Sequence, residues 1–263
     1  MQISLAGRNA LITGGSKGLG LAMATRFAAS GANVAILARN PENLDQARRT
    51  IGATAQGRVA AFACDVSKAD DVRRGYEAAM AEFGHIDILV NNAGISRAMP
   101  FGEITDEMWQ DDLDLKLFAA IRLCRLAMPR MQERRWGRII NVLNIGAKAP
   151  RANGAPTVVS RAAGMALTKV LAGEGAPFNV LVNALLVGVI VSDQWVRRHD
   201  AQVAEGANTS FEDYAVKLGA NVPLGRLGRA EEFAAMACLL CSEEGGYITG
   251  TAINVDGGAS PVV

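Results

Sequence analysis

Short apolar runs alternate with longer amphipathic segments along the 263-residue chain, and this alternation limits the possible folds most strongly. The runs are rich in Val, Ile and Ala and lack a strict in/out alternation, as expected of strands buried on both faces of a sheet. Strands that alternate with helices form a doubly wound parallel sheet through right-handed crossovers. We therefore predict an α/β fold with about seven parallel strands and helices on both faces. The predicted strands are 9–13, 33–38, 59–64, 87–91, 137–143, 178–185 and 251–255, and the predicted helices are 19–30, 41–51, 68–83, 106–134, 157–174 and 229–242.

One segment, at about 189–224, interrupts this rhythm before the last helix and strand. Long insertions of this kind often cover a ligand, so we expect a lid-like element here. A chain of this length can bury one large core, and no linker or repeat divides it. Residues 1–263 are accordingly expected to form a single domain that carries this insertion.

Composition excludes several function classes. The net charge of +1 gives no electrostatic basis for binding nucleic acid or an anionic membrane. The N-terminus lacks the pattern of a signal segment, and no apolar run reaches the roughly 18 residues of a membrane span. Cys238 and Cys241 form a C-x-x-C, but it has no second pair and no nearby His, so it is a poor zinc site. We expect core packing for all four cysteines and a reducing, cytoplasmic compartment. They are Cys64, Cys124, Cys238 and Cys241.

The segment NALITGGSKGLGLAMA (9–24) reads as a strand, a glycine-rich turn and a helix. Its glycines, at positions 14, 18 and 20, allow positive φ angles and let a phosphate approach the backbone. The helix that follows offers free N–H groups and the positive end of its dipole to a pyrophosphate. Strand, turn and helix occur together, so the segment predicts a dinucleotide-binding site.

The end of the second predicted strand bears on the choice of nucleotide. An acidic residue there would bind a ribose 2′-hydroxyl and select NAD, but this chain has Ala38 and Arg39. Together with Ser16 and Lys17 in the glycine turn, Arg39 can bind a 2′-phosphate. We therefore predict a preference for NADP(H), with NAD(H) as the alternative; Arg39 as a solvated surface charge is the competing interpretation.

Seven motifs in order give the chain a resemblance to the short-chain dehydrogenase/reductase family from end to end. It is most similar to the members of the 3-oxoacyl-carrier-protein-reductase type. The resemblance implies a seven-stranded Rossmann-type sheet, binding of NAD(P), and usually a tetramer. The motifs are TGGSKGLG (13–20), CDV (64–66), DILVNNAG (87–94), GRIINV (137–142), VNALLVG (182–188), PLGRLGRAEEFA (223–234) and YITGTAINVDGG (247–258).

The same resemblance assigns cofactor contacts along the chain. It places Asp65 and Val66 beside the adenine and Gly188 and Val189 near the nicotinamide. Ser192 matches the usual threonine on the nicotinamide side. The expected cofactor-binding residues are Gly14, Ser16, Lys17, Gly18, Leu19, Gly20, Arg39, Asp65, Val66, Asn91, Ala93, Gly94, Arg161, Gly188, Val189 and Ser192.

The four catalytic positions depart from the family pattern. The family uses an Asn, a Ser, a Tyr and a Lys, with the Tyr and the Lys four residues apart, and no Y-x-x-x-K occurs in this chain. Flanking motifs place Lys116 at the Asn position, Asn144 at the Ser position, Thr157 at the Tyr position and Arg161 at the Lys position. We treat these four residues as the catalytic candidates.

Their chemistry restricts how a reaction can proceed. A threonine hydroxyl is too weak an acid to replace a phenol, and Arg161 does not give up its proton. Arg161 can still hold a ribose, and Asn144 can donate an N–H to a substrate oxygen. Lys116, if buried beside Arg161, would have a lowered pKa and could act as the proton donor. Ser160 is expected to face away from the pocket.

Three functions remain open on the sequence alone. The first is an oxidoreductase that acts on a small carbonyl or alcohol through an altered proton path. The second is a lyase or isomerase reaction that uses Lys116, and the third is a nucleotide-binding protein without redox activity. The predicted helices 116–131 and 157–174 carry apolar residues on more than one face, so we also expect a homo-oligomer, either a dimer or a tetramer.

Overall fold

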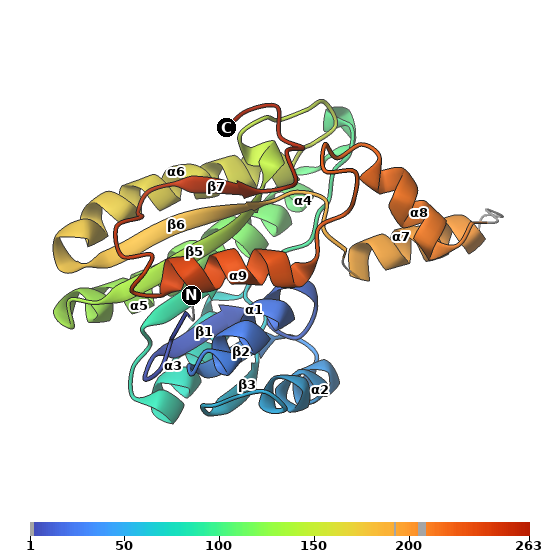
Figure 1. The fold of residues 1–263 in the computed structure, drawn as a ribbon. Coiled ribbons are helices and arrows are strands. Elements are labelled where there is room, and N and C mark those ends of the chain that lie inside the picture. Colours follow the sequence, from blue (N-terminus) through green and yellow to red (C-terminus); the bar gives the residue numbers. More distant parts are fainter. Residues whose placement is uncertain (1–2, 192, 205–208) are drawn as a thin grey trace.

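The computed structural model describes residues 3–191, 193–204 and 209–263. Within these residues the chain forms one sheet of seven parallel strands in the order β3-β2-β1-β4-β5-β6-β7, with helices on both faces (Figure 1). This confirms the predicted fold class. The strands are β1 (Asn9–Thr13), β2 (Asn33–Ala38), β3 (Val59–Ala63), β4 (Ile88–Asn91), β5 (Gly137–Asn144), β6 (Val180–Val187) and β7 (Ala252–Val255).

The helices form two layers around the sheet. One face is covered by α1 (Gly18–Ala29), α2 (Pro41–Gly52) and α9 (Ala230–Cys241), with α1 packed against both of the others. The other face is covered by α3 (Ala69–Phe83), α5 (Ala119–Glu133) and α6 (Thr157–Gly175), and α4 (Asp106–Leu113) contacts the latter. Both faces of the central strands are therefore buried, which explains why these strands lack alternation in sequence.

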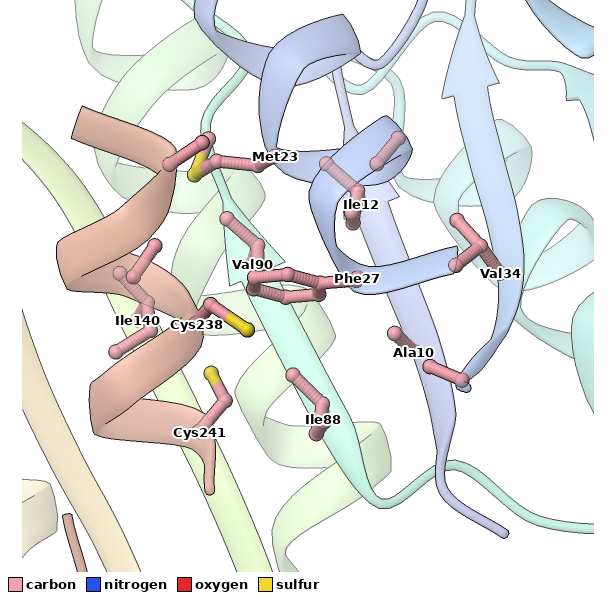
Figure 2. Packing of buried hydrophobic residues seen from close by; sticks show 14 of the residues in the cluster. Ala10, Ile12, Met23, Phe27, Val34, Ile88, Val90, Ile140, Cys238 and Cys241 are labelled. Atoms are coloured by element: carbon pink, nitrogen blue, oxygen red, sulfur yellow. The ribbon is translucent and has the colours of Figure 1, made fainter. Parts of the chain in front are cut away.

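The apolar core between the sheet and the pair α1 and α9 is shown in Figure 2. Phe27 of α1 is fully buried beside Val90 of β4 and the cysteines of α9, Cys238 and Cys241. All four cysteines of the chain are free and buried, as predicted. Burial raises the pKa of the Cys124 thiol to about 12, so this sulfur behaves as an inert core group.

The prediction of a single helix over 106–134 is wrong. The structure divides it into α4, a π-helical turn over Asp114–Phe118, and α5. The apolar periodicity passes through all three parts, so it did not reveal the break. Such π turns are rare and often occur at functional sites. This one contains Lys116.

In the described part of the segment 189–224, the helices α7 (Asp193–Ala204) and α8 (Phe211–Gly219) stand out from the body of the sheet (Figure 1). The ring of His199 in α7 lies 5.6 Å from Phe211 and 5.5 Å from Tyr214 in α8. No helix in the described part of the chain is long and apolar enough to cross a membrane.

Candidate active site

A cleft of about 460 Å³ opens where the carboxyl ends of β1, β4, β5 and β6 meet. In the strand order, the crossovers change direction between β1 and β4, and ligands of doubly wound sheets bind at such a point. Among the residues that the structure describes, no Asp or Glu lines this cleft. The lining is Gly14, Lys17, Gly18, Leu19, Gly20, Asn92, Ala93, Gly94, Ile95, Ser96, Val142, Asn144, Ile145, Gly146, Arg161, Val187, Gly188, Val189 and Ile190.

The glycine turn forms one end of the cleft. Gly14 adopts a φ of +64°, and its N–H donates to the carbonyl of Leu37 in β2 at 2.7 Å. A Cβ atom on Gly20 would overlap the carbonyl oxygen of Gly14, so only glycine allows α1 to begin so close to the turn. No side chain caps the N-terminus of α1, which leaves N–H groups of its first turn facing outward. This backbone cradle fits a pyrophosphate.

The other predicted cofactor residues are dispersed along the same edge. Ala93, Gly94, Gly188 and Val189 line the cleft, while Ser16 lines a separate hollow of about 310 Å³ that it shares with Lys17 and Gly18. Arg39 is exposed directly after β2. Ser192 lies outside the described residues.

Asp65, Val66 and Asn91 are also outside the lining of the cleft. Asp65 turns its carboxylate back to the N–H and hydroxyl of Ser67, at 3.1 and 2.8 Å. Val66 is buried. Asn91 points below the cleft, where its Nδ2 donates to Asn141 Oδ1 at 2.9 Å and its Oδ1 has no partner among the described residues.

The four candidate catalytic residues lie at or behind the reaction end of the cleft, and of the four, Asn144 and Arg161 line the cleft itself. Lys116 Nζ donates to Thr157 Oγ1 at 2.8 Å, and the backbone N–H of Arg97 donates to the same oxygen at 2.9 Å. Lys116 reaches Thr157 from the π turn, across the gap between that turn and α6. The Lys116 side chain is only 4% exposed. Two positions 41 residues apart in sequence thus share one hydrogen bond.

A second layer of contacts lies behind this pair. Lys116 Nζ forms an ion pair with Asp112, and the Ser160 hydroxyl donates to the other Asp112 oxygen at 2.6 Å. As predicted, Ser160 does not line the cleft, but it contributes to the contacts behind the cleft wall. It lines a cavity of about 20 Å³ together with Lys116, Arg161 and Asn91, directly behind the cleft wall.

Arg161 lines both the cleft and this small cavity. Its guanidinium donates to the carbonyl of Val142 at 2.9 Å, and its Nε has no partner among the described residues. A Cβ on Gly94 would stand 3.3 Å from the Arg161 guanidinium, a tight contact, and 3.5 Å from Lys116 Cγ, an ordinary one, so Gly94 gives the guanidinium room at the cleft wall.

Asn144 ends β5 and lines the cleft opposite the glycine turn. Its Oδ1 is buried and has no hydrogen-bond partner within the described residues. Buried polar atoms of this kind are uncommon and call for an explanation. A ligand that donates a hydrogen bond at this end of the cleft would satisfy the amide.

Electrostatics at this end favour a titrating lysine. Burial is the largest cause that lowers the pKa of Lys116, to about 8, with further lowering from Arg161 and Arg97 and an opposing contribution from Asp112. Burial likewise lowers the pKa of Arg161 to about 10, which leaves it charged at neutral pH. Lys116 therefore changes protonation state in a range useful for acid–base chemistry.

Sequence reasoning missed two residues of the site. Asp112 was overlooked because it lies one turn before Lys116 in a segment that reads as a plain amphipathic helix. An Asp four residues before a Lys is the signal that could have found it. The second residue is Asn92, which follows the predicted residue Asn91. Its Nδ2 donates a hydrogen bond to the carbonyl oxygen of Thr13 at 2.9 Å and so holds the start of the glycine turn.

Comparisons with known proteins agree with this geometry. The family described as Enoyl-(Acyl carrier protein) reductase matches residues 14–260. The curated 3beta-hydroxysteroid dehydrogenase 1 of Eggerthella lenta is 37% identical over 261 residues, which cover 98% of this chain and 95% of that protein.

Two solved structures are similar over nearly their full length. The L-sorbose reductase of Gluconobacter frateurii, complexed with NADPH and L-sorbose, has 34% identity and a TM-score of 0.95 with complete coverage of both chains. The NADPH-bound short chain oxidoreductase of Pseudomonas aeruginosa PAO1, described as containing an atypical catalytic center, has 36% identity, a TM-score of 0.90 and coverage of 99% and 100%. With its parallel sheet, glycine turn and carboxyl-end cleft, this chain belongs to the short-chain dehydrogenase/reductase family.

Proposed function

We propose that this protein is an NADP(H)-dependent oxidoreductase that interconverts a carbonyl group and an alcohol on a small molecule, with Lys116 as the source of the proton. The observation that carries the proposal is the hydrogen bond from Lys116 Nζ to Thr157 Oγ1, 2.8 Å long. Thr157 is the position that the family resemblance assigns to the proton-donating tyrosine, and this hydrogen bond supports Lys116 as the source of the proton there.

The nucleotide end of the cleft fits the cofactor. The uncapped first turn of α1 suits the pyrophosphate, and Lys17 and exposed Arg39 offer positive charge beside the end of β2, where a 2′-phosphate would lie. NADPH is present in the solved structures of both similar reductases. When bound, NADPH supplies the hydride that goes to the carbonyl carbon.

This chain's residues supply the proton. The two lone pairs of Thr157 Oγ1 accept from Lys116 and from the Arg97 N–H, so the hydroxyl proton of Thr157 is directed elsewhere. As negative charge develops on the substrate oxygen, Thr157 donates this proton and receives one from the Lys116 ammonium. The threonine is thus a relay rather than an acid, which removes the objection that its own hydroxyl is too weakly acidic.

Asn144 and Arg161 have supporting roles. The Asn144 amide N–H stabilises the developing oxyanion, and its unpartnered Oδ1 accepts from the cofactor or the substrate. Arg161 holds the ribose next to the nicotinamide through its guanidinium, whose Nε lacks a protein partner among the described residues. Because it stays protonated, Arg161 takes no part in proton transfer.

A second candidate, nucleotide binding without turnover, is favoured by a different observation. Neither Lys116 nor Thr157 is among the described residues that line the cleft. Lys116 lines the small cavity behind it, and Thr157 is only 1% exposed. A cleft that never brings substrate within reach of Thr157 would bind nucleotide and do nothing more.

A pair of measurements separates these candidates. Titration of the protein with NADPH, followed by cofactor fluorescence, tests binding, and NADPH oxidation across a panel of small ketones, aldehydes and sugars tests turnover. We expect both to be positive. Binding without oxidation of NADPH anywhere in the panel would favour the second candidate, and absence of binding would reject both.

Substitutions then test the proton path. Lys116→Met and Thr157→Val are each expected to lower kcat by about 10²–10⁴-fold, the usual contribution of a general acid. Thr157→Ser keeps the hydroxyl and is the matched control, expected to retain most activity. If Thr157→Val retained the activity of Thr157→Ser, the relay through Thr157 would be wrong.

A homo-oligomer is also proposed. The exposed side of α6 carries Val159 and Val170, which are 48% and 57% exposed. Large apolar side chains on the outside of a helix that already buries its opposite side against the sheet suit contact with a second copy.

We also propose that α7 and α8 act as the lid of the single domain.

A further inference from the structure

We infer that Asp112 is a positioning residue for Lys116, and that its buried carboxylate, held by Ser160, keeps the lysine ammonium charged and directed at Thr157. The catalytic part of this inference rests on the proposed function. The contacts of Asp112 and the measurement of the Lys116 pKa are independent of that function. The carboxylate lies near the end of α4 and is not among the described residues that line the cleft.

The first line of support is geometric. The Asp112 side chain is 1% exposed, and both of its oxygens are occupied, one by the ion pair with Lys116 and the other by the Ser160 hydroxyl at 2.6 Å. The Ser160 hydroxyl has a single proton, and its oxygen also lies 3.1 Å from the carbonyl oxygen of Thr157. The carboxylate is therefore fixed between α4 and α6 and leaves Lys116 little freedom to turn away from Thr157.

The second line of support is electrostatic. The charged groups that face Lys116 are Arg161 from α6, Arg97 from the loop after β4, and Asp112 from α4. Two of these are cations that disfavour a charged lysine. Asp112 is the single anion among them, so it is the group that opposes burial, Arg161 and Arg97 together. An uncompensated buried ammonium would lose its proton.

A third observation is that this carboxylate differs from its neighbours. Asp111 is exposed and lies 3.7 Å from Arg97, and Asp114 pairs with Arg122 at 2.7 Å on the partly exposed side of the π turn. Only Asp112 of this acidic run reaches the lysine. Asp114 therefore offers a matched control for the loss of one carboxylate from the same segment.

The experiment measures the protonation of Lys116 without turnover. Competitive acetylation of the whole protein over a range of pH, read by mass spectrometry at the peptide that contains Lys116, reports the pKa of this amine. Asp112→Asn is expected to lower that pKa by at least one unit, whereas Asp114→Asn should leave it unchanged. Identical acetylation curves for Asp112→Asn and wild type would overturn the inference.

Turnover provides the second readout. In Asp112→Asn, we expect the decline of kcat at high pH to begin at least one pH unit earlier, with NADPH affinity unchanged within about twofold. In a Lys116→Met background, the same substitution should have no further effect on kcat, since Asp112 acts through the lysine. An additive loss would overturn the positioning role. A shifted acetylation curve with no turnover in any variant would instead count against the proposed function alone.

Asp112→Glu keeps the test decisive if Asp112→Asn does not fold. The glutamate retains the charge but displaces it by one methylene group. We expect the pKa of Lys116 to stay near its wild-type value while kcat falls about tenfold, because the ammonium is no longer aligned with Thr157. Unchanged kcat would contradict the positioning role.

Discussion

The two ends of the cleft recognise their ligands by different means. At the nucleotide end, backbone groups and the absence of side chains create the site, as in the turn from Gly14 to Gly20. At the reaction end, the site we propose depends on side chains, namely Lys116, Asn144, Thr157 and Arg161. The difference is that substitutions of glycine should disturb the first end, whereas the protonation of side chains should govern the second.

The largest effect of a substitution is expected at the nucleotide end. Gly20→Ala adds a Cβ that would overlap the Gly14 carbonyl oxygen and approach Asn92 Nδ2 to 2.6 Å, so the turn must shift. We expect NADPH affinity to fall at least 100-fold in a fluorescence titration. Gly52→Ala, at a helix end with open space around it, is the control and should bind NADPH like wild type. Equal affinity in both variants would show that the turn does not bind the cofactor.

The same end of the cleft should also determine the choice between NADPH and NADH. Arg39→Asp removes a charge-assisted contact to the 2′-phosphate and adds repulsion, so NADPH affinity should fall about 10–100-fold while NADH affinity stays similar or rises. Isothermal titration of both cofactors measures this. Arg48→Asp makes the same charge change on the exposed surface of α2 and should alter neither affinity. An unchanged NADPH affinity in Arg39→Asp would make Arg39 a solvated surface charge.

At the reaction end, pH provides a graded test. In carbonyl reduction Lys116 acts in its protonated form, and its pKa is lowered to about 8, chiefly by burial. The reductive kcat should therefore be level below pH 8 and fall about tenfold per unit above it. In the oxidative direction, which needs the neutral amine, the dependence should be reversed. A reductive profile without a limb near pH 8 would argue against Lys116.

The smallest effect is expected away from both ends. Val170→Glu places a charge on the exposed apolar side of α6 and should shift the protein toward monomers in light scattering at micromolar concentrations, with the NADPH affinity of each monomer unchanged. Val216→Glu changes a similarly exposed valine on α8 and is the control. A monodisperse wild-type monomer would contradict the proposed assembly.

Much of the fold and of the nucleotide end could be predicted from the sequence. The strand boundaries agree within one residue except for β6, which begins and ends two residues later than predicted, because buried parallel strands are short apolar runs bounded by turn residues. The glycines at positions 14, 18 and 20 could be placed because their role depends on backbone conformation, which local sequence encodes. The π turn was not predicted, since a single inserted residue leaves the apolar pattern intact.

The sequence by itself determined the sheet, the glycine turn and the choice of four candidate residues, because these follow from local patterns and ordered motifs. Only the tertiary structure decided which contacts those residues make. It brings Lys116 from the π turn to Thr157 at the start of α6, places Asp112 and Ser160 behind them, and buries Arg161 beside them. Protonation depends on burial and on charges from distant segments, and these exist only once the helices have packed on the sheet.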